Sequence, residues 1–373
     1  MTLGEEGRVG SSAARKVSEQ DIRPLEQGSS AARRVSAQDL GPLERVSDEG
    51  AAVAPQPQPI TAGEFTDERM VRARSLPPAG GFRKFLYWIT GGLVPIGPSG
   101  SALRELELVA RVKTPVAGSR RIVVISRKGG VGKTTTTLML GHTFATHRGD
   151  RVVALDGNPD AGSLGYRVRQ ETTATVTDLL RDSVVIDRYA DIRAYTSQAS
   201  TRLEVVASDD NPRISHALEE DQYNSVVDLL ERHYNLILLD TGTGILDSAT
   251  KGFLSLADQI VLVAPPNLDG GRASSLTFDW LDEHGYRHLV KGAVTVINAF
   301  TPGGLVEVDR IEEHFRRRCR AVVRIPWDSL LQAGAETTLS ELKPATQRAY
   351  LNLAAAVADG FGPRWWMAPI SPA

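Results

Sequence analysis

The chain has 373 residues and a formal net charge of −2, so its overall charge does not draw it to nucleic acid or anionic lipid; any such contact must come from a local patch. It holds a single cysteine, Cys319, which excludes an internal disulfide and suits a reducing cytoplasm. No run approaches the roughly 18 apolar residues of a membrane span, and the first residues lack the basic start and apolar core of a signal peptide. We therefore expect a soluble cytoplasmic protein in which one large α/β domain carries a tail.

Residues 1–80 are expected to form a disordered tail, because they are rich in Gly, Ser, Pro, Gln and mixed charges and nearly lack aromatic residues. The tail contains a repeat, in which Gly10–Ser18 recurs with small changes as Gly28–Ser36. Two interpretations stay open. The copies form a duplicated docking or phosphorylation segment, since Ser18 and Ser36 each follow two basic residues and a valine, or they record a duplication in an unconstrained tail.

Residues 81–120 are expected to form a helical lead-in to the main domain. Phe82–Ile89 combines aromatic residues with Arg83 and Lys84. This composition fits a short helix that docks on a partner or a membrane surface, but we favour a helix that packs on the domain behind it. Ala102–Val112 has the pattern of a second helix.

Residues 121–360 alternate apolar, β-branched runs with helical patterns. The runs expected to form strands are Ile122–Ser126, Val152–Leu155, Leu203–Ala207, Leu236–Leu239, Ile260–Ala264, Ala293–Ile297 and Ala321–Ile325. Helical patterns lie between most of them, for example at Asn224–His233, Arg272–His284 and Val306–Arg318. Continuous apolar strands joined by helices predict an α/β fold with a mostly parallel, doubly wound sheet. Ligands of such sheets bind at the carboxyl ends of the strands.

A glycine-rich stretch, Arg127–Thr135, follows the first of these strands and opens a helical pattern. This context predicts a phosphate-binding loop, because glycines let backbone N–H groups surround phosphate oxygens at the positive end of a helix. Lys133 would reach the β- and γ-phosphates, and the Thr134 hydroxyl would hold Mg²⁺. The residues expected to contact the nucleotide in this loop are Gly129, Gly130, Val131, Gly132, Lys133, Thr134 and Thr135.

The loop departs from the strict phosphate-loop pattern at its first position, where Arg127 replaces a glycine. The remaining pattern, x-K-G-G-x-G-K-T-T, resembles the deviant P-loop of the ParA/MinD ATPase family. The resemblance implies a P-loop NTPase fold and Mg²⁺-dependent ATP hydrolysis. It also implies an ATP-dependent homodimer, in which a second lysine, here Lys128, crosses the interface to the nucleotide of the partner subunit.

A second motif, Asp156–Asp160, comes directly after the strand expected at Val152–Leu155. It resembles the switch I sequence D-x-D-P of the family, with Asp156 in the first position at the metal. The family uses its second aspartate to orient and activate the attacking water, and Asn158 stands there in this chain. An amide positions water but cannot accept its proton. Water activation would then fall to Asp160, a partner or the substrate phosphate, so we expect slow or partner-stimulated hydrolysis.

A third motif is the apolar run Leu236–Leu239 ending in Asp240, followed by Thr241–Gly244. A buried strand that ends in an aspartate can deliver a carboxylate to Mg²⁺. The stretch resembles the Walker B and switch II segment of the family, although this chain has Gly242 and Thr243 where prolines are common.

At two further strand ends, site residues are predicted only on the basis of the resemblance. The family ends one strand with an asparagine that hydrogen-bonds the adenine edge, and Asn298 stands at the corresponding position after Val294–Ile297. Ile325–Asp328 resembles the I-P-x-D stretch that flanks the base, with Pro326 as the contact.

An arginine cluster and a tail complete the chain. Residues Arg316–Arg318, Arg320 and Arg324 form a basic cluster, which is either a solvated helix face or a nonspecific DNA contact. Residues 361–373 form a C-terminal tail with two tryptophans at 365 and 366, and Pro363 disfavours the amphipathic membrane helix with which MinD-type proteins end.

The combined motifs predict an ATP-binding and ATP-hydrolysing switch that dimerises with ATP and regulates or positions a partner complex. Phe82–Trp88 and the Asp156–Gly162 stretch resemble the actinobacterial branch of the family, which is associated with type VII (ESX) secretion, and so suggest secretion machinery as the partner. Two alternatives stay open. One is a nucleotide-gated scaffold with little hydrolysis, favoured by Asn158; the other is a ParA-like partitioning ATPase that binds DNA through the arginine cluster.

Overall fold

The computed structural model describes residues 100–158, 162–209, 218–245, 247–301 and 307–362. The expected tail with its repeat, the aromatic segment Phe82–Ile89, Asp160 and the tryptophans of the C-terminal tail all lie outside these residues. Among the described residues, no helix is long and apolar enough to cross a membrane.

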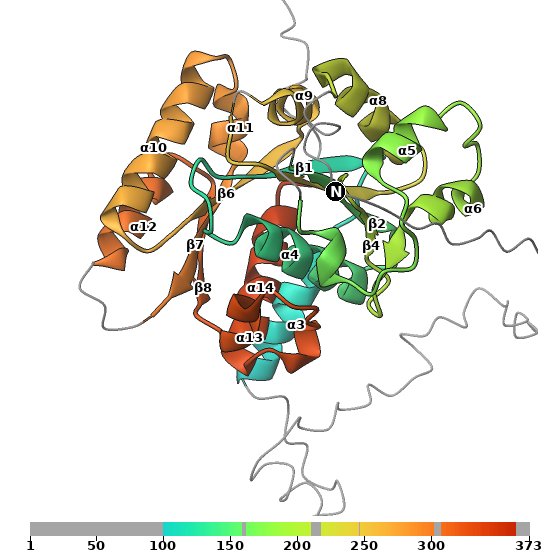
Figure 1. Cartoon of the computed structure of the whole chain (residues 1–373). Coiled ribbons are helices and arrows are strands. Elements are labelled where there is room, and N and C mark those ends of the chain that lie inside the picture. Colours follow the sequence, from blue (N-terminus) through green and yellow to red (C-terminus); the bar gives the residue numbers. More distant parts are fainter. Residues whose placement is uncertain (1–99, 159–161, 210–217, 246, 302–306, 363–373) are drawn as a thin grey trace, which may run out of the picture. The chain divides into compact units, whose positions relative to one another are not determined.

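The described chain builds one eight-stranded sheet in the order β3-β4-β2-β5-β1-β6-β7-β8 (Figure 1). The strands are β1 Arg120–Ile125, β2 Val152–Gly157, β3 Ser197–Gln198, β4 Glu204–Val206, β5 Leu236–Thr241, β6 Gln259–Ala264, β7 Val294–Phe300 and β8 Ala321–Pro326. Every pairing is parallel except that of β3 with β4, which is antiparallel. The predicted doubly wound parallel sheet is therefore confirmed, and β3 is an edge strand that the sequence did not indicate.

Helices cover both faces of this sheet, as Figure 1 shows. One face carries α3 Gly100–Val112, α4 Lys133–His147 and α14 Pro344–Ala358, and α13 Ser329–Ala333 lies beside them. The other face carries α5 Val176–Arg181, α6 Tyr189–Ile192, α8 Glu220–Glu231, α9 Ser248–Leu256, α10 Leu268–Glu283, α11 Arg287–Gly292 and α12 Val308–Arg316. Short 3-10 turns at Gly165–Arg167, Arg193–Tyr195 and Leu339–Glu341 are η2, η3 and η4.

The strands are apolar throughout because each one is buried on both sides. Along β1, Ile122 and Val124 contribute to the core under α4 and α14, whereas Val123 and Ile125 contribute to the core under α8 and α9. All four are at most 2% exposed. Successive side chains of a strand point to opposite faces of the sheet, and here both faces are covered by the apolar sides of helices. The strand sequences are therefore continuous apolar runs and do not alternate between apolar and polar residues.

Helix α3 belongs to this packed unit, because it lies against α14 at the C-terminal end of the described chain. Arg111 of α3 pairs with Asp359 through an Nη2–Oδ2 contact of 2.6 Å. The first core strand begins one residue earlier than the expected domain boundary at 121, with Arg120 buried at 4% exposure. The guanidinium of Arg120 donates to the backbone carbonyls of Phe361 and Gly362.

Candidate nucleotide site

The glycine loop joins the carboxyl end of β1 to the N-terminus of α4, as the sequence predicts for a phosphate loop. Gly130 and Gly132 adopt φ angles of 70° and 92°, in the left-handed region that disfavours residues with a Cβ. Gly132 is also crowded, since a Cβ there would lie 2.3 Å from Nδ2 of Asn298. Both glycines are thus required by the backbone path of the loop.

Lys133 is the first residue of α4 and is only 9% exposed. Burial lowers the pKa of its ammonium group, and the charge of Asp240 opposes that shift. A buried ammonium group at a helix N-terminus, together with the glycine N–H groups beside it, forms a site that favours binding of an anion.

Two buried carboxylates lie beneath the loop. Asp156 at the end of β2 and Asp240 at the end of β5 are direct neighbours in the parallel register, and each is 1% exposed. Burial raises the pKa of Asp156, and the charge of Asp240 raises it further. Burial also raises the pKa of Asp240, while hydrogen bonds from Thr134 and Thr137 act in the opposite direction. The Thr137 hydroxyl donates to Asp240 over 3.0 Å.

The donor set fits Mg²⁺, which prefers hydroxyl and carboxylate oxygens. Two adjacent carboxylates repel each other when both are ionised, and a divalent cation would relieve that repulsion. Thr134 contributes the hydroxyl through its place on α4 next to Asp240. Among the described residues, no group of three or more His, Cys, Asp or Glu side chains could hold a metal ion by itself, so such an ion would also need the Thr134 hydroxyl, water or phosphate oxygens.

The glycine loop, the segments at and after the carboxyl ends of β2, β5, β6 and β8, and the end of β7 line a cleft of about 660 Å³. This volume lies within the usual range for small-molecule sites, roughly 300–1,000 Å³. Its lining includes all the loop residues from Gly129 to Thr135, and also Asn158, Arg167, Thr241–Thr243, Asn298, Pro326, Trp327 and Leu331.

Residues of β7 and β8 form the end of the cleft that lies nearest the β8 edge of the sheet. Asn298 donates through Nδ2 to the carbonyl oxygen of Val131 over 2.7 Å, so it ties β7 to the glycine loop. The next residue, Ala299, has a positive φ of 56° at an irregularity in the β7–β8 pairing. Trp327, after Pro326, is 43% exposed, and the Lys343 ammonium lies 5.0 Å from its ring centroid.

The structure brings most of the expected site residues together. The loop residues, Asn158, Asn298 and Pro326 line one cleft, and Asp156 and Asp240 lie buried at the adjoining strand ends. Lys128 is exposed and does not line the cleft. Asp160 is outside the described residues.

Trp327 and Arg167 are the two large lining side chains nearest the predicted motifs that the sequence did not assign a role. Trp327 stands inside the Ile325–Asp328 stretch, so its position next to Pro326 was a usable signal. Arg167 stands in η2, eight residues beyond Pro159, and no pattern marks it. Its place in the cleft arises from tertiary structure alone.

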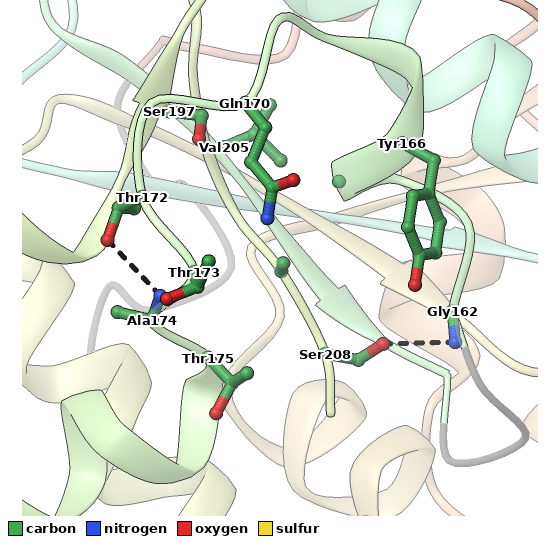
Figure 2. Close-up of a pocket in the computed structure, with 12 residues that line it drawn as sticks. Gly162, Tyr166, Gln170, Thr172, Thr173, Ala174, Thr175, Ser197, Val205 and Ser208 are labelled. Atoms are coloured by element: carbon green, nitrogen blue, oxygen red, sulfur yellow. Dashed lines mark hydrogen bonds between the residues drawn. The ribbon is translucent and has the colours of Figure 1, made fainter. Parts of the chain in front are cut away.

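A second pocket lies between the segment that follows β2 and the end of β4 (Figure 2). It measures about 50 Å³ and is lined by hydroxyl, amide and small side chains without a charged residue. Figure 2 shows the Gly162 N–H pointing to the Ser208 hydroxyl, which it meets at 3.0 Å, and Ala174 N–H donating to Thr172. These hydrogen bonds hold the segment that follows β2 in place. The described residues that line the pocket include no charged side chain that could bind an ionic ligand.

Four arginines of the cluster near the C-terminus pair with carboxylates, and the fifth, Arg320, donates to a backbone carbonyl. Arg318 contacts Asp279 and Asp282 of α10 at 2.5 and 2.9 Å. Arg316 and Arg324 both pair with Glu312. Arg317 pairs with Glu313 over 2.5 Å, and Arg320 donates to the carbonyl of Gly292.

The parallel sheet, the glycine loop that opens α4 and the buried lysine above two strand-end carboxylates define a P-loop NTPase fold. Residues 119–269 match the family model described as "AAA domain". The chain is 39% identical over 284 residues to the ESX-1 secretion-associated protein EspI of Mycobacterium tuberculosis strain H37Rv, a match that covers 75% of this chain and 42% of that protein. It is 30% identical over 156 residues to the septum site-determining protein MinD of Synechocystis, covering 41% of this chain and 56% of that one.

Solved structures agree in fold. A ParA family ATPase from Chlorobium tepidum superposes with a TM-score of 0.55 at 18% identity, covering 64% of this chain and 98% of that one. The cell division ATPase MinD of Pyrococcus furiosus gives a TM-score of 0.53 at 20% identity, with the same coverage of 64% and 98%. The chain thus belongs to the ParA/MinD-type P-loop ATPases and is related to EspI, although it spans only about two fifths (42%) of the length of that relative.

Proposed function

We propose that the chain binds ATP with Mg²⁺ in the cleft, hydrolyses it slowly, and acts as an ATP-dependent dimeric switch for a partner complex. The observation that carries this proposal is the buried ammonium of Lys133 at the N-terminus of α4. A cation in that position is stabilised by phosphate oxygens, which the glycine-loop N–H groups also bind.

Each site residue then has a role in holding the substrate. Lys133 binds the β- and γ-phosphates, and Gly129–Gly132 and Thr135 supply further donors. Thr134, Asp156 and Asp240 would hold Mg²⁺, which would supply positive charge against the phosphates. Asn298 would have to exchange its bond to Val131 for the base, and Pro326 would flank that base.

Hydrolysis needs a water molecule and a proton acceptor. Asn158 lines the cleft and can orient the water through its amide, but it cannot take the proton. We assign that step to Asp160 or to the substrate phosphate. Turnover should therefore be slow without a partner.

We propose dimerisation because Lys128 is exposed beside the cleft rather than inside it. A lysine in this position can reach the nucleotide of a second copy. Lys128→Ala should leave nucleotide affinity unchanged while it reduces ATP-dependent dimer formation and hydrolysis. Unchanged dimerisation by light scattering would contradict this role.

For the partner we propose type VII secretion machinery in the cytoplasm, on the strength of the likeness to EspI, a protein named for its association with ESX-1 secretion. We place the DNA-partitioning alternative behind this proposal, because carboxylates or backbone carbonyls already engage each arginine of the cluster.

The test is ATP turnover measured together with mass by light scattering, with Mg²⁺ and either ATP or ADP. A dimer that forms with ATP, dissociates with ADP and turns over slowly is the expected result. Tight ATP binding without turnover or dimerisation would favour the second candidate, a nucleotide-gated scaffold, which Asn158 supports. Absence of ATP binding would refute both.

A further inference from the structure

Arg167 is the least expected residue of the cleft. It ends the short η2 turn, Gly165–Arg167, in the segment that follows β2. Its side chain lines the cleft, and Nη1 donates to the Thr135 hydroxyl over 2.7 Å. Thr135 is the third residue of α4, so the guanidinium lies against the first turn of the phosphate-binding helix.

The charge of Arg167 lacks a direct counter-ion. Within the described part of the chain it forms no ion pair, and its Nε is closed off from solvent without a hydrogen-bond partner. Burial lowers the pKa of the guanidinium, while Asp240 and Asp156 attract it from beyond ion-pair distance. A half-buried guanidinium whose buried Nε donor is unused is costly unless an anion completes its surroundings.

Helix geometry places Arg167 and Lys133 on different sides of the same phosphate site. Successive residues of an α-helix project about 100° apart, so Thr135 and Lys133 point in nearly opposite directions from the axis. The guanidinium that contacts Thr135 therefore approaches the helix N-terminus from the side that Lys133 does not occupy. Because Lys133 serves the β- and γ-phosphates, the side left for Arg167 is that of the phosphates closer to the nucleoside.

A second wall of the cleft also meets Arg167. Its guanidinium lies 3.6 Å from the position a Cβ would take on Gly334, the residue that ends α13. Leu331 of α13 lines the same cleft. Arg167 thus joins the segment after β2 to the wall formed by α13, across the N-terminus of α4.

We propose that Arg167 is a nucleotide-binding residue that acts within one subunit and donates to the α- or β-phosphate, the part that ATP and ADP share. This inference rests on the proposed function, since it requires a nucleotide in the cleft. It predicts that Arg167 stabilises both nucleotides alike and is separate from any γ-phosphate sensor.

The experiment titrates ATP and ADP, each with Mg²⁺, into the full chain by calorimetry, and compares wild type with Arg167→Gln and Arg167→Lys. Arg169→Gln is the matched control, because Arg169 is an exposed arginine of the same segment that does not line the cleft. Loss of a charge-assisted bond should weaken both nucleotides by similar factors of about 10-fold to 100-fold in Arg167→Gln. Arg167→Lys should recover part of the loss, and Arg169→Gln should match wild type.

Melting temperatures without nucleotide separate binding from a structural role. Arg167→Gln should melt no lower than wild type, since it removes a half-buried charge without an ion-pair partner among the described residues. Wild-type affinity for both nucleotides in Arg167→Gln, a loss confined to ATP, or a lower melting temperature at unchanged affinity would each overturn the inference. Failure of the wild type to bind any nucleotide would instead overturn the proposed function.

Discussion

Two buried polar clusters of this protein differ in how completely the chain itself satisfies them. The first surrounds Glu204 of β4, which is 2% exposed. Its carboxylate accepts hydrogen bonds from the hydroxyls of Tyr189, Tyr234 and Thr196, and Arg193 lies 3.7 Å away. Burial and the carboxylate raise the pKa of both tyrosines, that of Tyr189 to about 12, so both remain donors.

The second cluster lies at the carboxyl edge of the sheet and combines Lys133, Asp156, Asp240 and Arg167. Here two adjacent carboxylates have raised pKa values, the lysine has a lowered one, and the arginine keeps an unused donor. Buried polar groups are normally satisfied, so a cluster left incomplete marks the place of a ligand. The Glu204 cluster is completed by the chain itself, whereas the Lys133 cluster is one that the proposed phosphate and metal ion would complete.

The largest effect should follow from Lys133→Ala, which removes the central cation of the incomplete cluster. Deleting one partner of a buried charge pair costs about 3–5 kcal/mol, so ATP affinity should fall at least ~100-fold. Calorimetric titration would measure it. Arg127→Ala is the control, because it removes an exposed cation of the same loop. Retained ATP affinity in Lys133→Ala would count against the whole site.

Asp240→Asn should have the next largest effect, through the metal ion. The amide keeps the size of the side chain but removes one charged oxygen, so the gain in ATP affinity from Mg²⁺ should shrink about 10-fold to 100-fold. Titrations with Mg²⁺ and after its removal by EDTA would measure this gain. An identical Mg²⁺ dependence in wild type and variant would rule out Asp240 as a metal residue.

Glu204→Gln tests the satisfied cluster and should show the opposite pattern. It weakens the charge-assisted bonds from Tyr189 and Tyr234 and should lower the free energy of unfolding by about 1–3 kcal/mol. Nucleotide affinity should not change, because Glu204 does not line the cleft. Denaturant unfolding and calorimetry on one sample would check both; reduced affinity at full stability would contradict the division into two clusters.

The smallest effect concerns His142 of α4, whose imidazole has a hydrogen-bond partner at only one of its two nitrogens among the described residues. Nδ1 meets the Thr201 hydroxyl at 2.7 Å, while Nε2 is buried without a hydrogen-bond partner among the described residues. Burial lowers the pKa of this imidazole from 6.5 to about 4. The unfolded chain therefore binds the proton first, and stability is lost as the pH falls from 6.5 towards 4.

Between pH 7 and 5.5 this loss should be about 1 kcal/mol. Comparing wild type with His142→Gln by denaturant unfolding at each pH isolates it, because other titrating groups are common to both. Parallel pH profiles for the two proteins would show that His142 does not titrate as the structure implies.

The sheet could be predicted because its strands are continuous apolar runs, and the glycine loop could be predicted because β1 and α4 frame it. Edge strand β3 could not be predicted, since two residues are too few to show a repeating pattern. The place of Arg167 in the site could not be predicted, because it depends on a contact with Thr135, 32 residues earlier in the chain. The pairing of Arg318 with Asp279 and Asp282 of α10 also emerges only when the helices pack.

The measurement that tests the central claim most directly is a calorimetric titration of ATP into the full wild-type chain, with Mg²⁺ and again after chelation. Completion of the Lys133 cluster predicts saturable binding of one nucleotide per chain, which weakens when Mg²⁺ is removed. Absence of binding in the presence of Mg²⁺ would contradict the claim that the incomplete cluster is a nucleotide site.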